Sequence, residues 1–199
     1  TQDSQGWALS FLKRHQLHAH LYRRTQNKSY YPYWKTQLNR NQYAQAEVEK
    51  LGRQIRDEGY PVYLLTAYTL MGEIYKDWGE RDISDIEFLL SEENLWRFED
   101  ALKMFGYEKK VQTRWLGNRF TYEYLQKKGD FDLRIKVHTQ FFWHSPIEVT
   151  KPKSCRLDGF APLSREQQLL HMCGQLGLQK QFSEILLLLD LFKFVERFQ

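Results

Sequence analysis

Two acidic residues stand two positions apart in a segment that otherwise has the composition of a β-strand. Residues 83–90 read Ile-Ser-Asp-Ile-Glu-Phe-Leu-Leu, and this run predicts a strand between an arginine-bearing turn and a following helix. Because side chains alternate along a strand, Asp85 and Glu87 share one face while Ile86 and Phe88 share the other. The segment therefore predicts a sheet strand with one apolar face and one acidic face.

Two carboxylates held this close together repel each other unless a cation lies between them. Hard divalent metals such as Mg²⁺ or Mn²⁺ take oxygen ligands and in turn hold phosphates. The pair formed by Asp85 and Glu87 therefore suggests metal-assisted phosphoryl or nucleotidyl transfer. The alternative is a solvent-facing strand whose acids only keep the protein soluble.

No stretch of the sequence is long and apolar enough to span a bilayer. The longest apolar run, residues 185–189, ends at Asp190, whereas a spanning helix needs about 20 apolar residues. Residues 1–6 lack the basic and apolar regions of a signal peptide, and two cysteines argue against a disulfide framework. A hydrophobic content of 42% over 199 residues indicates a folded globular protein. We place it in the cytoplasm, away from membranes.

The charge pattern argues against a nucleic-acid-binding protein. The formal net charge is only +4, and the basic residues occur as scattered pairs such as Arg23-Arg24 and Lys109-Lys110. No block is concentrated enough to give a nucleic-acid footprint. A basic cleft assembled in the folded chain could still attract polyphosphates, although an ordinary solvated surface explains the same pattern.

The predicted elements follow an order typical of a mixed α+β domain. Ala44, Val48, Leu51 and Ile55 recur at four- and three-residue steps and predict a helix over residues 37–58. The other predicted helices cover residues 4–24, 66–75, 91–105 and two segments that begin with a capping box at 164–167. The predicted strands cover residues 61–65, 83–90, 108–114, 119–126 and 131–142, with a hairpin turn at 128–130.

This order predicts three parts. A helical lead-in covers residues 1–59, an α/β core covers residues 60–145, and a loop with C-terminal helices covers residues 146–199. We expect the three parts to form one compact unit. Because antiparallel strands follow the β-α-β-α segment, the order excludes a doubly wound sheet.

Several short motifs occur in the order and spacing of a known family. They are Leu64-Leu65-Thr66-Ala67, a helix, Gly79-x-Arg81, Asp85-Ile86-Glu87-Phe88-Leu89-Leu90, Leu102-x-x-Phe105-Gly106-Tyr107 and Ile135-Lys136-Val137-His138. Together, over roughly residues 47–196, they resemble the uncharacterised bacterial nucleotidyltransferase family of the polymerase-β-like superfamily. The resemblance implies a nucleotidyltransferase-like mixed sheet with a helical N-terminal extension and a helical C-terminal tail.

The resemblance also implies a chemistry. Such enzymes bind a nucleoside triphosphate with two divalent metals, Mg²⁺ or Mn²⁺. They transfer the nucleotide to an acceptor, a small molecule or a protein side chain that the motifs do not identify. Three carboxylates converge on the metals, which polarise the α-phosphate and neutralise the departing pyrophosphate. By this resemblance Asp85 and Glu87 are catalytic residues and metal ligands.

The nucleotide-binding positions depart from the family pattern. Thr66-Ala67 replaces a Lys-Gly pair, which deletes a cation and adds a Cβ where the phosphates should approach the backbone. Glu87 stands where an aspartate is usual and reaches one methylene further. Arg81 matches the family's arginine and could clamp a phosphate, or it could pair with Asp82 or Glu80 to fix its turn.

The third acid has two alternatives. Aligning His138 with the family's histidine puts Lys136 at the acid position, whereas aligning Asp132 with the acid puts Arg134 at the histidine position. Strand alternation places all four residues on one face. We prefer the first alignment because Phe141 and Phe142 continue it better.

These alternatives lead to two functions. Asp132 as the third catalytic acid favours an active, metal-dependent nucleotidyltransferase. Lys136, with His138 beside it, would instead act as a permanent internal cation or bind a phosphate without any metal. That arrangement favours a family member that has lost catalysis and binds a ligand or a protein partner in the cleft that holds the active site in the enzymes.

Overall fold

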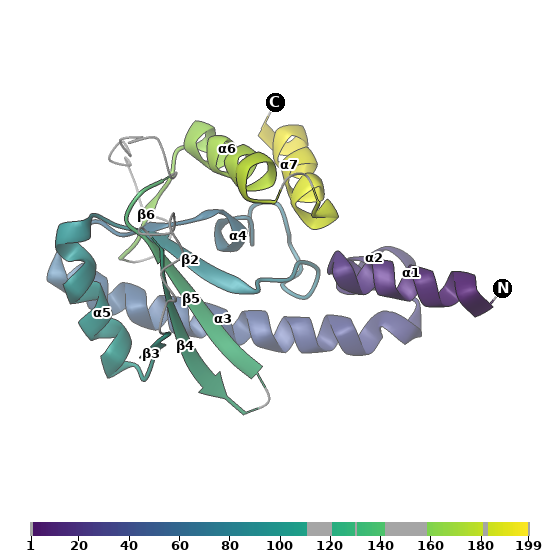
Figure 1. The fold of residues 1–199 in the computed structure, drawn as a ribbon, viewed down its shortest axis with the longest axis horizontal. Coiled ribbons are helices and arrows are strands. Elements are labelled where there is room, and N and C mark those ends of the chain that lie inside the picture. Colours follow the sequence, from purple (N-terminus) through teal and green to yellow (C-terminus); the bar gives the residue numbers. More distant parts are fainter. Residues whose placement is uncertain (1, 111–120, 130, 142–158, 181–182, 199) are drawn as a thin grey trace. The chain divides into compact units, whose positions relative to one another are not determined.

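The computed structural model describes residues 2–110, 121–129, 131–141, 159–180 and 183–198 (Figure 1). The chain divides into two compact units that alternate along the sequence. Unit 1 comprises Thr1–Tyr43, Leu70–Asp82 and Met172–Gln199, and unit 2 comprises Ala44–Thr69 and Ile83–His171. Each unit contains buried side chains of its own.

Unit 2 is built on a mixed sheet that has six strands within the described residues, in the order β3-β4-β5-β2-β1-β6 (Figure 1). The strands are β1 Tyr63–Leu64, β2 Asp85–Leu89, β3 Glu108–Lys109, β4 Thr121–Lys128, β5 Phe131–His138 and β6 Ala161–Pro162. β2 runs parallel to β5 and β1 runs parallel to β6, while the other neighbours are antiparallel. The predicted α+β class with a mixed sheet is confirmed.

The apolar face of the acidic strand is buried, as its alternation predicts. Phe88 of β2 packs edge-on against Phe98 of α5 (Leu95–Met104), which follows the short η2 (Glu92–Asn94), and it also contacts Phe160. The unit 2 half of α3 (Tyr31–Glu58) adds a stripe of buried side chains. These are Ala44, Val48, Leu51 and Ile55, the residues whose spacing predicted the helix. Phe88 is thus buried among apolar side chains, and Asp85 and Glu87 lie on the opposite face of β2.

Two local predictions in unit 2 are confirmed. Lys128 pairs with Phe131 across the hairpin turn, and Gly129 has a φ of +57°, which suits a tight β-hairpin. At the start of α6 (Arg165–Gly174), the Gln167 N–H donates to Ser164 Oγ (3.2 Å), and Gln167 Oε1 accepts from the Ser164 N–H (3.1 Å). This reciprocal pair is a capping box.

Unit 1 collects helices from both ends of the chain. They are α1 Gln2–Arg14, α2 His18–Thr25, η1 Lys28–Tyr30, the first part of α3, the π-helical turn η3 Gln175–Gln179 and α7 Ile185–Phe198. Residues 70–82 pack among them, because the Asn41 side chain donates to the carbonyls of Trp78 (2.6 Å) and Arg81 (2.7 Å). In the part of the chain that the structure describes, the apolar helical stretches are all too short to cross a membrane.

Two predicted helices were wrong in extent. The helix predicted over residues 4–24 is interrupted at Gln16, whose φ is +56°. The helix predicted over residues 66–75 ends early, as α4 (Thr66–Thr69). Gly72 has a φ of +81°, and its N–H donates to Tyr75 O (2.8 Å), so a turn replaces the second half of that helix. Most of the predicted 146–162 loop, and residues 111–114 of a predicted strand, lie outside the described residues.

Candidate functional site

The pairing of β2 with β5 decides which charges meet. Asp85 lies opposite Arg134, Glu87 lies opposite Lys136, and Leu89 lies opposite His138. Because the two strands are in register and side chains alternate, the acids of β2 and the bases of β5 share one face. We call this set of five ionisable residues the acid–lysine cluster: Asp85, Glu87, Arg134, Lys136 and His138. All of it lies within unit 2.

Lys136 lies between the two acids. Its Nζ is 2.6 Å from Asp85 Oδ2, a charge-assisted hydrogen bond, and 4.0 Å from Glu87 Oε1. Arg134 adds a second cation, with Nη1 3.4 Å from Asp85 Oδ1. Burial alone would lower the pKa of Lys136, but the attraction of Asp85 and Glu87 outweighs it and raises the pKa. The lysine is therefore a permanent cation at neutral pH.

Glu87 is held ionised by its neighbours. Its side chain is 14% exposed, and His138 Nε2 lies 3.7 Å from its Oε2. Burial raises the pKa of Glu87, but the nearby imidazoles of His138 and His171 and the ammonium of Lys136 together lower it to about 2. Both acids of β2 are thus compensated by side chains of the protein itself.

Asp132 takes no part in this cluster. It is exposed and lies opposite Lys127 in the register of β4 and β5, two residues before Arg134. The position beside the acid pair is filled by Lys136, the residue that the preferred alignment put at the third-acid position. A further carboxylate, Glu123 of β4, lies opposite Lys136 on its other side and contributes to its raised pKa. Sequence reasoning could not find Glu123, because its place beside Lys136 depends on the pairing of β4 with β5.

Thr66 and Ala67 begin α4, and Thr66 is occupied by a buried contact. Its Oγ1 shares a hydrogen bond with His171 Nδ1 of α6. His171 is 3% exposed, and burial lowers its pKa to about 4 although Glu87 raises it. Ala67 is half-buried. Sequence reasoning missed His171 as a neighbour of the acid pair; its place on the buried face of an amphipathic helix was the available signal.

Arg81 belongs to unit 1, where it is buried against α7. It is 4% exposed, and its Nε and Nη2 lie 3.1 Å and 2.6 Å from Asp190 Oδ2. Asp190 also accepts a hydrogen bond from Tyr75 Oη (2.7 Å). Asp190 is therefore the main ion-pair partner of Arg81, in place of the predicted Asp82 or Glu80.

The acid–lysine cluster, as arranged, does not fit a divalent metal. Mg²⁺ takes oxygen ligands in near-octahedral geometry. Within the described residues, no group of three or more His, Cys, Asp or Glu side chains is placed to hold a metal ion. The space that a metal would share between Asp85 and Glu87 is taken by the ammonium of Lys136.

The buried His171 predicts a pH-dependent stability. Its pKa is about 4 in the folded protein against an ordinary 6.5, so between these values only the unfolded chain binds the proton. The contribution of neutral His171 to the free energy of unfolding is therefore present above pH 6.5 and is lost as the pH falls toward 4. We expect the free energy of unfolding to drop by about 2 kcal/mol between pH 6.5 and 4.5, and His171→Gln to flatten this drop. Urea denaturation across that range measures it, with His15→Gln as control; an unchanged slope in His171→Gln would contradict the assignment.

Comparison with known proteins gives a family match over nearly the whole chain. The model of a family described as uncharacterised nucleotidyltransferase matches residues 2–199. No curated protein matches the sequence. Similar solved structures include the lincosamide antibiotic adenylyltransferase LnuA with lincomycin bound, at 13% identity and a TM-score of 0.48, covering 78% of this chain and 94% of that one. Another is ANT(2″)-Ia in complex with adenylyl-2″-tobramycin, at 11% identity and a TM-score of 0.41, covering 79% and 99%.

Proposed function

Because this chain belongs to the uncharacterised nucleotidyltransferase family, we propose that it is a nucleotidyltransferase fold in which metal-dependent transfer has lapsed and which serves as a ligand-binding module. The observation that carries this proposal is the position of Lys136, 2.6 Å from Asp85 and 4.0 Å from Glu87. A metal-dependent member needs oxygen ligands at this place. Here the two acids are matched by protein cations instead.

The charge balance of the cluster supports the same proposal. Two carboxylates without a cation would repel each other and would gain from a bound metal. The ammonium of Lys136 and the guanidinium of Arg134 already lie beside Asp85. A bound metal would therefore add less stabilisation to the two acids. A metal ion would have to displace the partly buried ion pair of Lys136 and Asp85 before it could bind, and this displacement costs free energy.

A second candidate is the active enzyme, which would transfer a nucleotide from a nucleoside triphosphate to a small-molecule or protein acceptor with Mg²⁺ or Mn²⁺. One observation favours it: Asp85 and Glu87 are both retained on one face of β2 and are partly exposed. This candidate requires Lys136 to leave Asp85 when the nucleotide and metal arrive. Placement in the cytoplasm remains a prediction under both candidates.

Calorimetric titration with ATP, in Mg²⁺ and in EDTA, separates the two candidates. For the lapsed module we expect Mg²⁺ to raise the ATP affinity by no more than about threefold, since no metal joins the phosphates to the acid pair. Asp85→Ala should leave this comparison unchanged. Glu108→Ala, at an exposed acid of β3 outside the acid–lysine cluster, is the matched control. An ATP affinity that rises at least about tenfold with Mg²⁺, and loses the rise in Asp85→Ala, would contradict the proposal and support the enzyme.

A further inference from the structure

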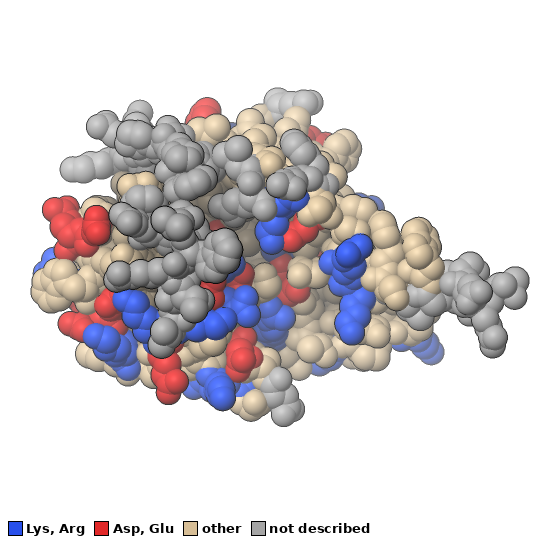
Figure 2. Space-filling view, in the orientation of Figure 1, with Lys and Arg blue, Asp and Glu red and all other residues tan. Residues whose placement is uncertain are grey.

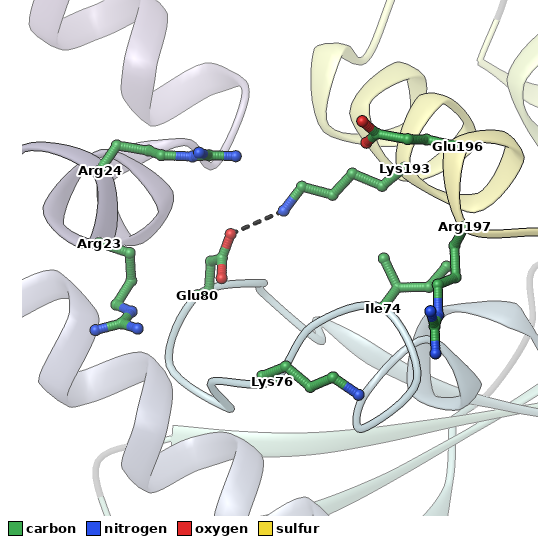
Figure 3. A pocket seen from close by; sticks show the side chains of 8 residues that line it. All are labelled: Arg23, Arg24, Ile74, Lys76, Glu80, Lys193, Glu196 and Arg197. Atoms are coloured by element: carbon green, nitrogen blue, oxygen red, sulfur yellow. Dashed lines mark hydrogen bonds and ion pairs between the residues drawn. The ribbon is translucent and has the colours of Figure 1, made fainter.

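Unit 1 contains a basic pocket that is separate from the residues of the acid–lysine cluster. It has a volume of about 460 Å³ and is lined from α2, from residues 70–82 and from α7 (Figure 3). Five basic side chains line it, against two acidic ones. The basic residues are Arg23, Arg24, Lys76, Lys193 and Arg197. The sequence shows them only as scattered charges, which the fold of unit 1 gathers.

The acids of this pocket neutralise only part of its charge. Glu80 accepts a hydrogen bond from Lys193 Nζ (2.8 Å) and pairs with His20 (2.9 Å). Burial raises the pKa of Glu80, but these two partners lower it to about 2, so it remains an anion matched to Lys193. Arg23 is likewise matched, because its Nε lies 2.6 Å from Asp77 Oδ2.

Among the described residues, three cations of the pocket have no carboxylate partner, and Glu196, the second acid of its lining, offsets at most one of their charges. Among the described residues, no acid pairs with Arg24 or Arg197, and Lys76 Nζ donates to the backbone carbonyl of Gly72 (2.8 Å). Figure 3 shows Arg24 extending from α2 toward Lys193, and Arg197 extending from α7 toward the side on which Lys76 lies. The three cations thus surround one hollow from three segments. An anion placed between them would relieve their mutual repulsion.

We propose that this pocket binds a polyphosphate anion. Guanidinium groups bind phosphate oxygens bidentately, and several cations converging on one hollow favour a multiply charged ligand over a single carboxylate. The volume lies within the usual range for small-ligand pockets, roughly 300–1,000 Å³. Ile74 is the one apolar residue among the described lining residues, and no aromatic ring lines the pocket. Recognition therefore rests on the phosphate chain, and a nucleoside attached to it adds little.

Inorganic tripolyphosphate is the probe for this site. We expect calorimetric titration in EDTA at low salt to show one binding event. The double variant R24Q/R197Q should weaken it by at least about tenfold, because both lost groups make charge-assisted hydrogen bonds. The matched control R14Q/R53Q removes the same charge at two exposed arginines outside the pocket, and should change the affinity by less than about twofold. ATP should bind within about threefold of tripolyphosphate.

Three results would overturn the proposal: no tripolyphosphate binding, equal losses in the two double variants, or binding of ATP without binding of tripolyphosphate. The test is independent of the proposed function. Asp85→Ala changes unit 2 and should leave the tripolyphosphate affinity as it is, whereas R24Q/R197Q should leave the metal dependence at the acid pair as it is. Failure of one proposal is therefore distinguishable from failure of the other.

Discussion

Replacing Lys136 with glutamate is expected to raise the affinity of the protein for Mn²⁺ by at least about 100-fold. The change removes the ammonium that lies 2.6 Å from Asp85 and puts a carboxylate in its place. Asp85, Glu87 and the new glutamate would then form three acids on one polar face, which supply the oxygen ligands that a divalent metal takes. The local charge changes by two units, and each unit at such distances is worth a few kcal/mol of interaction energy.

Two further variants separate a new metal ligand from a simple change of charge. Lys136→Gln removes the cation without supplying a carboxylate, so we expect a much smaller gain in Mn²⁺ affinity. Lys127→Glu makes the same two-unit change at an exposed position of β4, where salt screens its effect. Electron paramagnetic resonance of Mn²⁺ measures the free metal directly. Equal gains in Lys127→Glu and Lys136→Glu would contradict the assignment of Lys136 to the metal position.

The second large effect is expected in unit 1, where Asp190→Asn should lower the free energy of unfolding by about 3–5 kcal/mol. Asp190 is 1% exposed and pairs with Arg81, which is 4% exposed. Without the carboxylate, the buried guanidinium of Arg81 loses its ion-pair partner, and only the weaker attraction of Asp82 remains. Tyr75 also loses an ionic acceptor for its hydroxyl, 2.7 Å away.

Urea denaturation measures this loss, with Glu196→Gln as the control. Glu196 is an exposed acid on the same helix, so its change should alter the unfolding free energy by less than about 0.5 kcal/mol. The double variant R81M/D190L replaces the ion pair by apolar groups and should recover part of the stability. A loss below about 1 kcal/mol in Asp190→Asn would show that Arg81 is compensated by another group.

The parts of the fold that depend on short-range patterns could be predicted from the sequence. Alternation along β2 correctly separates the buried Phe88 from the polar Asp85 and Glu87. The hairpin at Gly129 and the capping box at Ser164 were confirmed for the same reason. Each depends on residues within a few positions, where backbone preference and local hydrogen bonds decide the structure.

Pairs that are far apart in the sequence could not be predicted. Arg81 meets Asp190 across 109 positions, and Thr66 meets His171 across 105. Neither pair has a sequence signal, because each contact depends on how separate elements pack. The early end of α4 was also missed. Gly72 forms a turn there, but it lies in a run whose other residues are compatible with a helix.

The third-acid position shows the limit most clearly. Alternation along β5 puts Asp132 and Lys136 on one face and does not choose between them; only the resemblance favoured Lys136. Only the register with β2, in which Glu87 lies opposite Lys136, decides which residue meets the acid pair. The catalytic and nucleotide-binding roles suggested for Asp132, Thr66, Ala67 and Arg81 stay predictions.

The most direct measurement is a Mn²⁺ titration of the unmodified protein, followed by electron paramagnetic resonance, beside Asp85→Ala. If the ammonium of Lys136 takes the place of the metal, the unmodified protein should bind Mn²⁺ no more tightly than about 1 mM. Any weak binding should then be the same in Asp85→Ala. Micromolar binding that disappears in Asp85→Ala would contradict the account, because it would mean that the acid pair accepts a metal despite Lys136.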